Sequence, residues 1–228
     1  MEAGSGSGDW MLMSNQDQSG TSGALLTRQE VIHALEENNP EKRLVVTPLL
    51  EQRIQSGTLD LRLGTKFVLG RRARQTCVDP LEIDEFEARR LQEYVDVPFH
   101  EYFVLHPNQL VLAGSLEYLS LPPGLAAQVI TRSTYGRMGV ISATAIHVHP
   151  GYKGCLTFEL LNLGQVPIRL HPGLRVAQLV FYRAGKEPPE LRQKYRLATR
   201  PEFPKMWEDD DTRILKKLRK DSSDSSKN

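Results

Sequence analysis

Short strand-like runs separated by turn residues fill the stretch from Glu101 to Arg183. The stretch contains YFVLHP, QLVLAGSLEYLSLP, LAAQVITRS, GVISATAIHV, GCLTFELLNLG, VPIRLHPG and LRVAQLVFYR, which recur about every dozen residues. The turn segments PNQ, PPG, HPGYKG, NLGQ and HPG interrupt them. Because Pro and Gly end strands and allow tight reversals, this pattern predicts an antiparallel sandwich, jelly roll or barrel rather than a parallel α/β sheet.

The sequence before these runs predicts a helix and a long strand. Thr27 and Glu30 have the spacing of a capping box, ahead of an apolar helix face that ends near Asn38. The run TLDLRLGTKFVLG alternates between apolar and other residues, as a strand does. The charged segment DEFEARRLQEYVDV predicts either an exposed short helix or a loop insertion.

The chain divides into three expected parts. Residues 1–25 are rich in Gly and Ser, lack the basic and apolar regions of a secretory signal, and predict a disordered leader. Residues 26–200 are expected to form one folded domain. Residues 201–228 predict a polar, partly disordered tail, in which TRILKKLRK forms a short basic helix and DSSDSSKN is disordered.

Composition excludes several classes of partner. The chain has 29 Lys and Arg against 28 Asp and Glu, so no overall field attracts nucleic acid or anionic membranes. No apolar run approaches the roughly 20 residues that cross a bilayer. Cys77 and Cys155 are the cysteines, and they predict reduced thiols in a cytoplasmic protein.

The stretch HVHPGYKGC, residues 147–155, holds three possible zinc ligands. These are His147, His149 and Cys155. A structural zinc site needs four ligands, and no fourth lies nearby in the sequence. We therefore interpret the stretch as a Pro-Gly turn and expect no metal site there.

Four motifs follow one another along the chain: TLDLRLG, TRSTYGRMGV, HPGYKGCLTFELLN and PGLRVAQLVF. In this order and spacing they resemble the deoxycytidine triphosphate (dCTP) deaminases, a branch of the dUTPase superfamily, over about residues 26–196. The resemblance implies a mostly-β, distorted jelly-roll or β-barrel fold of the dUTPase-like type with a short N-terminal helix. It also implies a homotrimer with active sites shared between subunits.

The chemistry of cytosine deamination agrees with this resemblance. It requires a water delivered to C4 and a group that moves protons to the ring nitrogen and to the leaving ammonia. Zinc deaminases combine a CxxC motif with His-x-Glu, and this chain has neither. Without a metal, a carboxylate of raised pKa in a partly dry pocket can serve. Glu159, the single charge in GCLTFELLN, matches the family's catalytic glutamate, although a buried glutamate could instead pair with an arginine.

The motif TRSTYGRMG is expected to supply the partners of Glu159. The resemblance implies that Ser133 holds the water and that Arg137 orients Glu159 and the pyrimidine. Arg132 would contact phosphate, which suits a planar bidentate donor. Taken alone, either arginine could form an ordinary surface salt bridge.

Further substrate contacts follow from the resemblance. In ISATAIHV, backbone groups of Ala143, Thr144 and Ala145 would read the edge of the pyrimidine. Tyr152 takes the place of an aromatic residue that packs near the deoxyribose, or it could be ordinary turn packing. Gln178 in LRVAQLVF occupies a position that contacts phosphate in many superfamily members, or it could form a hydrogen bond within the sheet.

The end of the matched region carries a weaker likeness. Lys194 and Tyr195 resemble the family's Lys-Tyr pair that folds over the triphosphate, although glutamines do not follow here. Arg196 or Arg200 could substitute in that closure. Asp60 in TLDLRLG also matches the family, and we interpret it as structural, pairing with a neighbouring element.

His147 and His149 stand where the deaminases usually carry Arg and Asp, at the sugar-binding edge of the nucleotide pocket. Both are therefore expected to bind substrate. A dUTPase places its water-activating carboxylate at position 149, whereas a neutral imidazole accepts a single hydrogen bond. This replacement argues against dUTPase as the sole activity.

Three functions remain open. The first is deamination of dCTP to dUTP and ammonia, with Mg²⁺ bound through the substrate triphosphate; a bifunctional variant would continue to dUMP and pyrophosphate. The second is the same enzyme class with dCMP, a modified cytosine nucleotide or dUTP as substrate. The third is a non-catalytic nucleotide-binding regulator. The first is favoured because binding alone needs no lone buried base.

Overall fold

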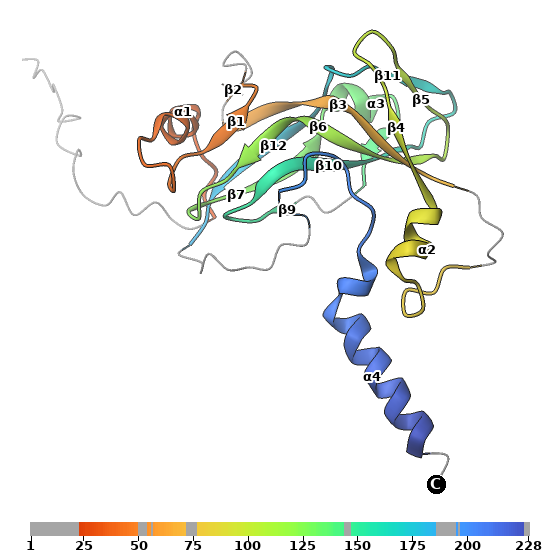
Figure 1. Cartoon of the computed structure of the whole chain (residues 1–228). Helices are drawn as coiled ribbons and strands as arrows, with labels where there is room; N and C mark the ends of the chain where they lie inside the picture. Colours follow the sequence, from red (N-terminus) through yellow and green to blue (C-terminus); the bar gives the residue numbers. More distant parts are fainter. Residues whose placement is uncertain are drawn as a thin grey trace, which may run out of the picture.

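The chain folds into a curled antiparallel sheet flanked by short helices (Figure 1). The computed structural model describes residues 23–49, 54–55, 57–71, 77–143, 147–185, 195 and 197–225. The elements are α1 (Arg28–Glu36), β1 (Val45–Thr47), β2 (Ile54–Gln55), β3 (Thr58–Gly70), α2 (Glu85–Arg90), β4 (Gln92–Asp96), β5 (Phe103–Leu105), β6 (Leu110–Ser120), β7 (Leu125–Thr131), α3 (Ser133–Arg137), β8 (Val140–Ser142), β9 (His147–Val148), β10 (Lys153–Asn162), β11 (Ile168–Leu170), β12 (Arg175–Arg183), η2 (Met206–Glu208) and α4 (Asp210–Ser225).

The main sheet has the strand order β8-β10-β6-β3-β12-β7-β9, with β1 added to β6 and with β2 and β4 added to β3. Strands β5 and β11 form a separate antiparallel pair. Each predicted run after residue 101 contains a strand, and GVISATAIHV contains both β8 and β9. The mostly-β fold with an N-terminal helix is therefore confirmed.

Strand β10 shows how the core and the candidate site share one element. Leu156, Phe158 and Leu160 point into the core and are at most 8% exposed. Thr157 and Glu159 alternate with them and therefore lie on the opposite face. The apolar face of β10 thus fixes the strand, while its other face presents a carboxylate.

Helix α1 begins with the predicted capping box. The Thr27 hydroxyl accepts from the Glu30 N–H at 3.3 Å, and Glu30 Oε2 accepts from the Thr27 N–H at 2.7 Å. The helix ends at Glu36, slightly before the expected end near Asn38. Glu30 also forms an ion pair with Arg183 at the end of β12, which holds the helix against the sheet.

The charged segment around residues 84–96 forms both a helix and a strand. Asp84 caps α2, because its side chain accepts from the Glu87 N–H at 2.8 Å. The chain then returns as β4, which pairs with residues 66–70 of β3. The second half of the segment is therefore a strand of the sheet, whereas the sequence predicted either an exposed short helix or a loop insertion.

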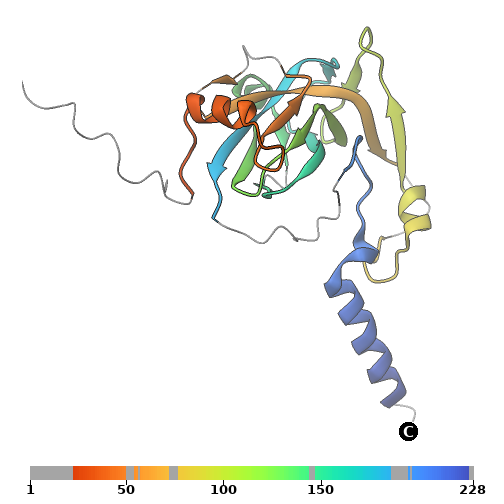
Figure 2. The same cartoon turned by 60° about the vertical axis from the view of Figure 1, so that its left-hand side comes forward.

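The C-terminal segment first forms hydrogen bonds with β10 and then extends away from the sheet. Leu197 donates its N–H to the Lys153 carbonyl at 2.6 Å, and Ala198 accepts from the Cys155 N–H at 2.7 Å. The expected basic helix is confirmed as α4, which extends away from the sheet in Figures 1 and 2. This helix continues to Ser225, into the segment 221–228 for which the sequence predicts disorder. Within the described ranges, no helix is long and apolar enough to cross a membrane.

Candidate active site

A five-residue helix, α3, holds two of the predicted catalytic residues at the surface. Ser133 and Arg137 are exposed, whereas Tyr135 between them is only 9% exposed and anchors the helix in the core. Burial raises the pKa of the Tyr135 hydroxyl above its ordinary value, although the charge of Arg132 opposes this. The helix ends at Arg137, and Gly139, with a φ of +89°, turns the chain into β8.

A buried carboxylate organises the start of this helix. The Asp60 side chain is fully buried, and its Oδ2 lies 2.5 Å from Arg132 Nη1 and 2.8 Å from Arg175 Nη1. Its Oδ1 accepts from Gln178 Nε2 at 3.0 Å. Burial alone would raise the pKa of Asp60, but the hydrogen bonds from Arg175 and Gln178 and the charge of Arg132 outweigh it and lower the pKa.

These contacts bear on three predictions. Asp60 pairs with neighbouring elements, as its structural interpretation required. Arg132 and Gln178 were expected to contact phosphate, and here both bind Asp60. Their roles as phosphate contacts stay predictions, although a guanidinium has five N–H donors and Arg132 keeps 22% of its side chain exposed. Arg175, the third partner, was not predicted.

The backbone joins Glu159 to the start of the base-reading segment. Glu159 is half-buried on β10, opposite Leu112 of β6. Its carbonyl accepts from the Ala143 N–H at 2.8 Å, directly after β8 pairs with β10. Thr144 and Ala145 lie outside the described residues. The link places Ala143 beside the strand of the predicted base.

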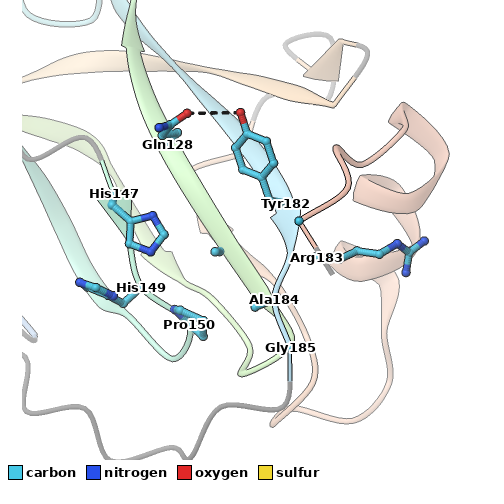
Figure 3. A pocket seen from close by; sticks show the side chains of 10 residues that line it. Gln128, His147, His149, Pro150, Tyr182, Arg183, Ala184 and Gly185 are labelled. Atoms are coloured by element: carbon cyan, nitrogen blue, oxygen red, sulfur yellow. Dashed lines mark hydrogen bonds between the residues drawn. The ribbon is translucent and has the colours of Figure 1, made fainter. Parts of the chain in front are cut away.

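His147 and His149 line an open cavity of about 740 Å³ (Figure 3). Their ring centroids are 4.6 Å apart, with an interplanar angle of 83°. Among the described residues, those lining the cavity do not include Ser133, Arg137 or Glu159. The lining residues are Gly23, Ala126, Gln128, His147, His149, Pro150, Tyr182, Arg183, Ala184 and Gly185.

Two polar residues of this cavity, Gln128 and Tyr182, were not predicted from the sequence. Tyr182 donates its hydroxyl to Gln128 Oε1 at 3.3 Å across β12 and β7, as the dashed line in Figure 3 marks. Val180 pairs with Gln128 and Tyr182 with Ala126 in the β12–β7 ladder, so both side chains lie on one face. The strand alternation of LAAQVIT and LRVAQLVFYR could have placed them together, had the register been known.

Tyr152 lies under the turn instead of projecting from it. Its hydroxyl donates to the Cys155 carbonyl at 2.8 Å, and its ring packs against the core. Burial raises the pKa of Tyr152 well above its ordinary value, with a smaller contribution from Cys155. The packing reading of Tyr152 has direct support in these contacts, and the deoxyribose contact stays a prediction.

Tyr195 contacts the C-terminal segment in this structure. Its hydroxyl accepts from the Lys205 N–H at 3.3 Å, and the Lys205 ammonium lies 5.4 Å from the ring centroid. Lys194 lies outside the described residues. Closure of this pair over a triphosphate stays a prediction.

The described residues contain no group of three or more His, Cys, Asp and Glu side chains placed to hold a metal ion. The cavity offers imidazole and amide groups rather than the carboxylate oxygens that suit Mg²⁺. A magnesium ion at this site would therefore depend on oxygens from the substrate.

Gly139 offers a test of how tightly α3 is held. A Cβ at Gly139 would lie 2.6 Å from the backbone nitrogen of Gly164, at a φ of +89°. We expect Gly139→Ala to lower the free energy of unfolding by about 2 kcal/mol or more. Gly136→Ala is the matched control, because no atom lies within 4 Å of its Cβ and alanine favours helix. Equal urea midpoints for the two variants would contradict this account.

The structure is similar to the crystal structure of 2′-deoxycytidine 5′-triphosphate deaminase from Agrobacterium tumefaciens, with a TM-score of 0.54 and 21% identity. That likeness covers 72% of this chain and 49% of that chain, so it spans about half of the larger structure. The chain therefore has a dUTPase-like fold, the class to which the curled antiparallel sheet and the helix α1 belong.

The sequence comparisons narrow this class to a family. Residues 25–184 match the family model described as dCTP deaminase-like. The chain is 42% identical to a dCTP deaminase of Halorubrum lacusprofundi over 163 residues, 69% of this chain and 76% of the relative. It is 40% identical to a dUMP-forming dCTP deaminase of Methanobrevibacter smithii over 160 residues, 69% of this chain and 79% of the relative. The chain belongs to the dCTP deaminase-like family.

Proposed function

We propose that this chain is a dCTP deaminase, which hydrolyses dCTP to dUTP and ammonia. The observation that carries the proposal is the family match over residues 25–184, which includes the predicted catalytic set. Ser133 and Arg137 lie on α3, which leads into β8, and β8 pairs with the β10 strand of Glu159. The set thus lies on elements that are connected through β8.

In this proposal Glu159 moves the protons of the reaction. It takes a proton from the water that Ser133 holds, and the resulting hydroxide adds to C4 of the cytosine. Glu159 delivers that proton to the ring nitrogen, then takes the remaining proton from the C4 hydroxyl and passes it to the amino group, which leaves as ammonia while the C4 carbonyl forms. Arg137 orients the carboxylate and the pyrimidine. The half-buried position of Glu159 supports this role, because a carboxyl partly removed from bulk water can pass protons directly to a bound substrate.

The remaining substrate contacts are proposed from the same set. Ala143 and the two residues after it read the pyrimidine edge, while His147 and His149 lie along the sugar. Arg132 contacts phosphate, and Mg²⁺ is bound through the triphosphate of the substrate. Bound there, the ion neutralises phosphate charge.

A homotrimer with shared active sites is part of the proposal. The histidine cavity is open and is lined by none of the predicted catalytic residues among those the structure describes, which favours completion by a second copy. Large apolar side chains are also exposed near α3: Ile130 by 40%, Met138 by 46% and Leu163 by 55%. Exposed apolar surface of this kind is typical of subunit contacts. A trimer mass in light scattering is the expected result.

A second candidate is a bifunctional enzyme that continues from dUTP to dUMP and pyrophosphate. The relative from Methanobrevibacter smithii, at 40% identity, is named dUMP-forming, and this favours the candidate. His149 opposes it, because an imidazole replaces the carboxylate that would activate the second water.

One assay separates these functions. The purified full chain is incubated with dCTP, CTP, dCMP or dUTP, with and without Mg²⁺, and ammonia and pyrophosphate are measured. Ammonia from dCTP without pyrophosphate is the expected result. Release of both from dCTP would support the bifunctional enzyme. Nucleotide binding without turnover of any substrate would contradict both enzymes and leave a binding protein.

A further inference from the structure

A single side-chain hydroxyl joins the two strands that flank α3. Thr131, the last residue of β7, accepts a hydrogen bond from the Ser142 N–H at 2.8 Å through its Oγ1. Among the described strands, β7 and β8 are not hydrogen-bonded neighbours in the sheet. The bond therefore joins the two ends of the segment between β7 and β8, which carries Ser133 and Arg137. No backbone ladder joins the described strands β7 and β8 at this place.

Ser142 is in turn tied to the strand of Glu159. Ser142 pairs with Leu160 of β10, and the next residue, Ala143, donates its N–H to the Glu159 carbonyl at 2.8 Å. Successive N–H groups of a strand point to opposite sides. Because the Ala143 N–H points toward β10, the Ser142 N–H points away from it, and Thr131 supplies its acceptor.

Other contacts hold different parts of the segment between β7 and β8. The ion pair with Asp60 holds Arg132 before α3, and Gly139 accepts from the Leu163 N–H at 2.8 Å at the start of β8. Neither contact reaches the end of β8. The Thr131 bond is the side-chain contact that the structure shows between β7 and that end, which adjoins Ala143.

We propose that Thr131 is a positioning residue for deamination: its hydroxyl sets the separation between the water-holding group of α3 and the Glu159 carboxylate. This role rests on the proposed function. Thr131 itself contacts neither water nor substrate in this role. In the proposed reaction Ser133 and Glu159 must both lie within hydrogen-bond distance of one water. The Thr131 hydroxyl keeps them there, and small displacements of such groups slow catalysis strongly.

The test compares Thr131→Val, which keeps the shape and removes the acceptor, with Thr131→Ser, which keeps the hydroxyl. We expect Thr131→Val to lower kcat for dCTP by about ten- to a hundredfold. KM should change much less, because Arg132, the proposed phosphate contact next to Thr131, is held by its ion pair with Asp60 rather than by this hydroxyl. Thr131→Ser should restore kcat to within about twofold of the wild-type enzyme. Thr58→Val makes the same chemical change at the half-buried first residue of β3 and should leave kcat unchanged.

Amide hydrogen exchange provides a readout independent of activity. The Ser142 N–H should exchange faster in Thr131→Val than in the wild-type chain and in Thr131→Ser. If Thr131→Val does not assemble or fold, Thr131→Ala removes the acceptor without adding an apolar group and replaces it in both measurements. These data connect the hydroxyl directly with the amide that it binds.

Two outcomes would overturn the proposal. One is a Thr131→Val enzyme with wild-type kcat, and the other is a Thr131→Ser enzyme as slow as Thr131→Val. Failure of the proposed function looks different, because the wild-type chain would then release no ammonia from dCTP. The positioning role of Thr131 would then be contradicted together with the proposed function. Faster amide exchange of the Ser142 N–H in Thr131→Val would still establish the hydrogen bond.

Discussion

Replacing Glu159 with glutamine is expected to lower kcat for dCTP deamination by about a thousandfold or more. Glutamine keeps the shape of the side chain and cannot carry a proton between water, ring nitrogen and amino group. The variant should fold normally, because Leu156, Phe158 and Leu160 keep the core face of β10. Nucleotide affinity should be little changed, since the substitution removes a proton carrier rather than a phosphate contact. Ammonia release and nucleotide titration measure the two effects.

Glu93→Gln is the matched control for this substitution. Glu93 also lies on a strand, β4, but its side chain is 47% exposed and forms an ion pair with Arg71. It should deaminate dCTP at the wild-type rate. If Glu159→Gln kept more than a small part of the wild-type activity while Glu93→Gln was fully active, Glu159 would not be the base.

Asp60→Asn is expected to lower the free energy of unfolding by about 3 kcal/mol. The substitution removes the negative charge that faces Arg132 and Arg175 while both guanidinium groups stay partly buried. It should also slow deamination, because the ion pair with Asp60 holds Arg132 directly before α3. Urea unfolding at neutral pH measures the first effect and ammonia release the second.

Asp96→Asn controls for the loss of an aspartate that pairs at the surface. Asp96 forms an ion pair with Lys66, but its side chain is 69% exposed. Solvent screening should keep its effect on stability within about 0.5 kcal/mol. If the Asp60 and Asp96 variants unfolded at the same urea concentration, the buried cluster would not stabilise the fold.

The pH dependence of stability provides a second readout for Asp60. Its pKa in the folded chain lies below the ordinary value of 3.8, so the unfolded chain binds this proton more readily. The contribution of Asp60 is therefore complete above about pH 4 and is lost as the pH falls through the lowered pKa. The difference in unfolding free energy between the wild-type chain and Asp60→Asn should narrow as the pH falls from 5 to about 3.

Much of the fold could be predicted because it follows from local patterns. The runs after residue 101 alternate or are continuously apolar, and Pro and Gly end them, so β5 to β12 lie where the sequence predicts them. The capping box at Thr27 and the basic helix α4 are equally local. Strand β4 escaped prediction because its charged residues are typical of a solvent-exposed segment, and an exposed strand on β3 tolerates them.

The candidate site also has parts that the sequence predicts and parts that it does not. The motif order predicted Ser133, Arg137 and Glu159 as a set, because the first two share one motif and Glu159 lies in the motif that follows it. The partners of Asp60 could not be paired in advance, since Arg175 and Gln178 lie 115 and 118 residues away. Such contacts depend on the register between β3 and β12, which aligns Gln178 with Asp60.

The amino-acid sequence by itself determined most of the strand content, the position of the helices α1 and α4 and the family, and it predicted a catalytic set, because each depends on neighbouring residues or on motifs in order. Only the tertiary structure decided that Arg132 and Gln178 bind Asp60, that Tyr152 lies under its turn and that Thr131 joins β7 to β8. It also placed His147 and His149 in one cavity with Gln128 and Tyr182. These contacts arise when a curled sheet brings distant strands together, and their geometry is set by the register of the whole sheet rather than by local sequence.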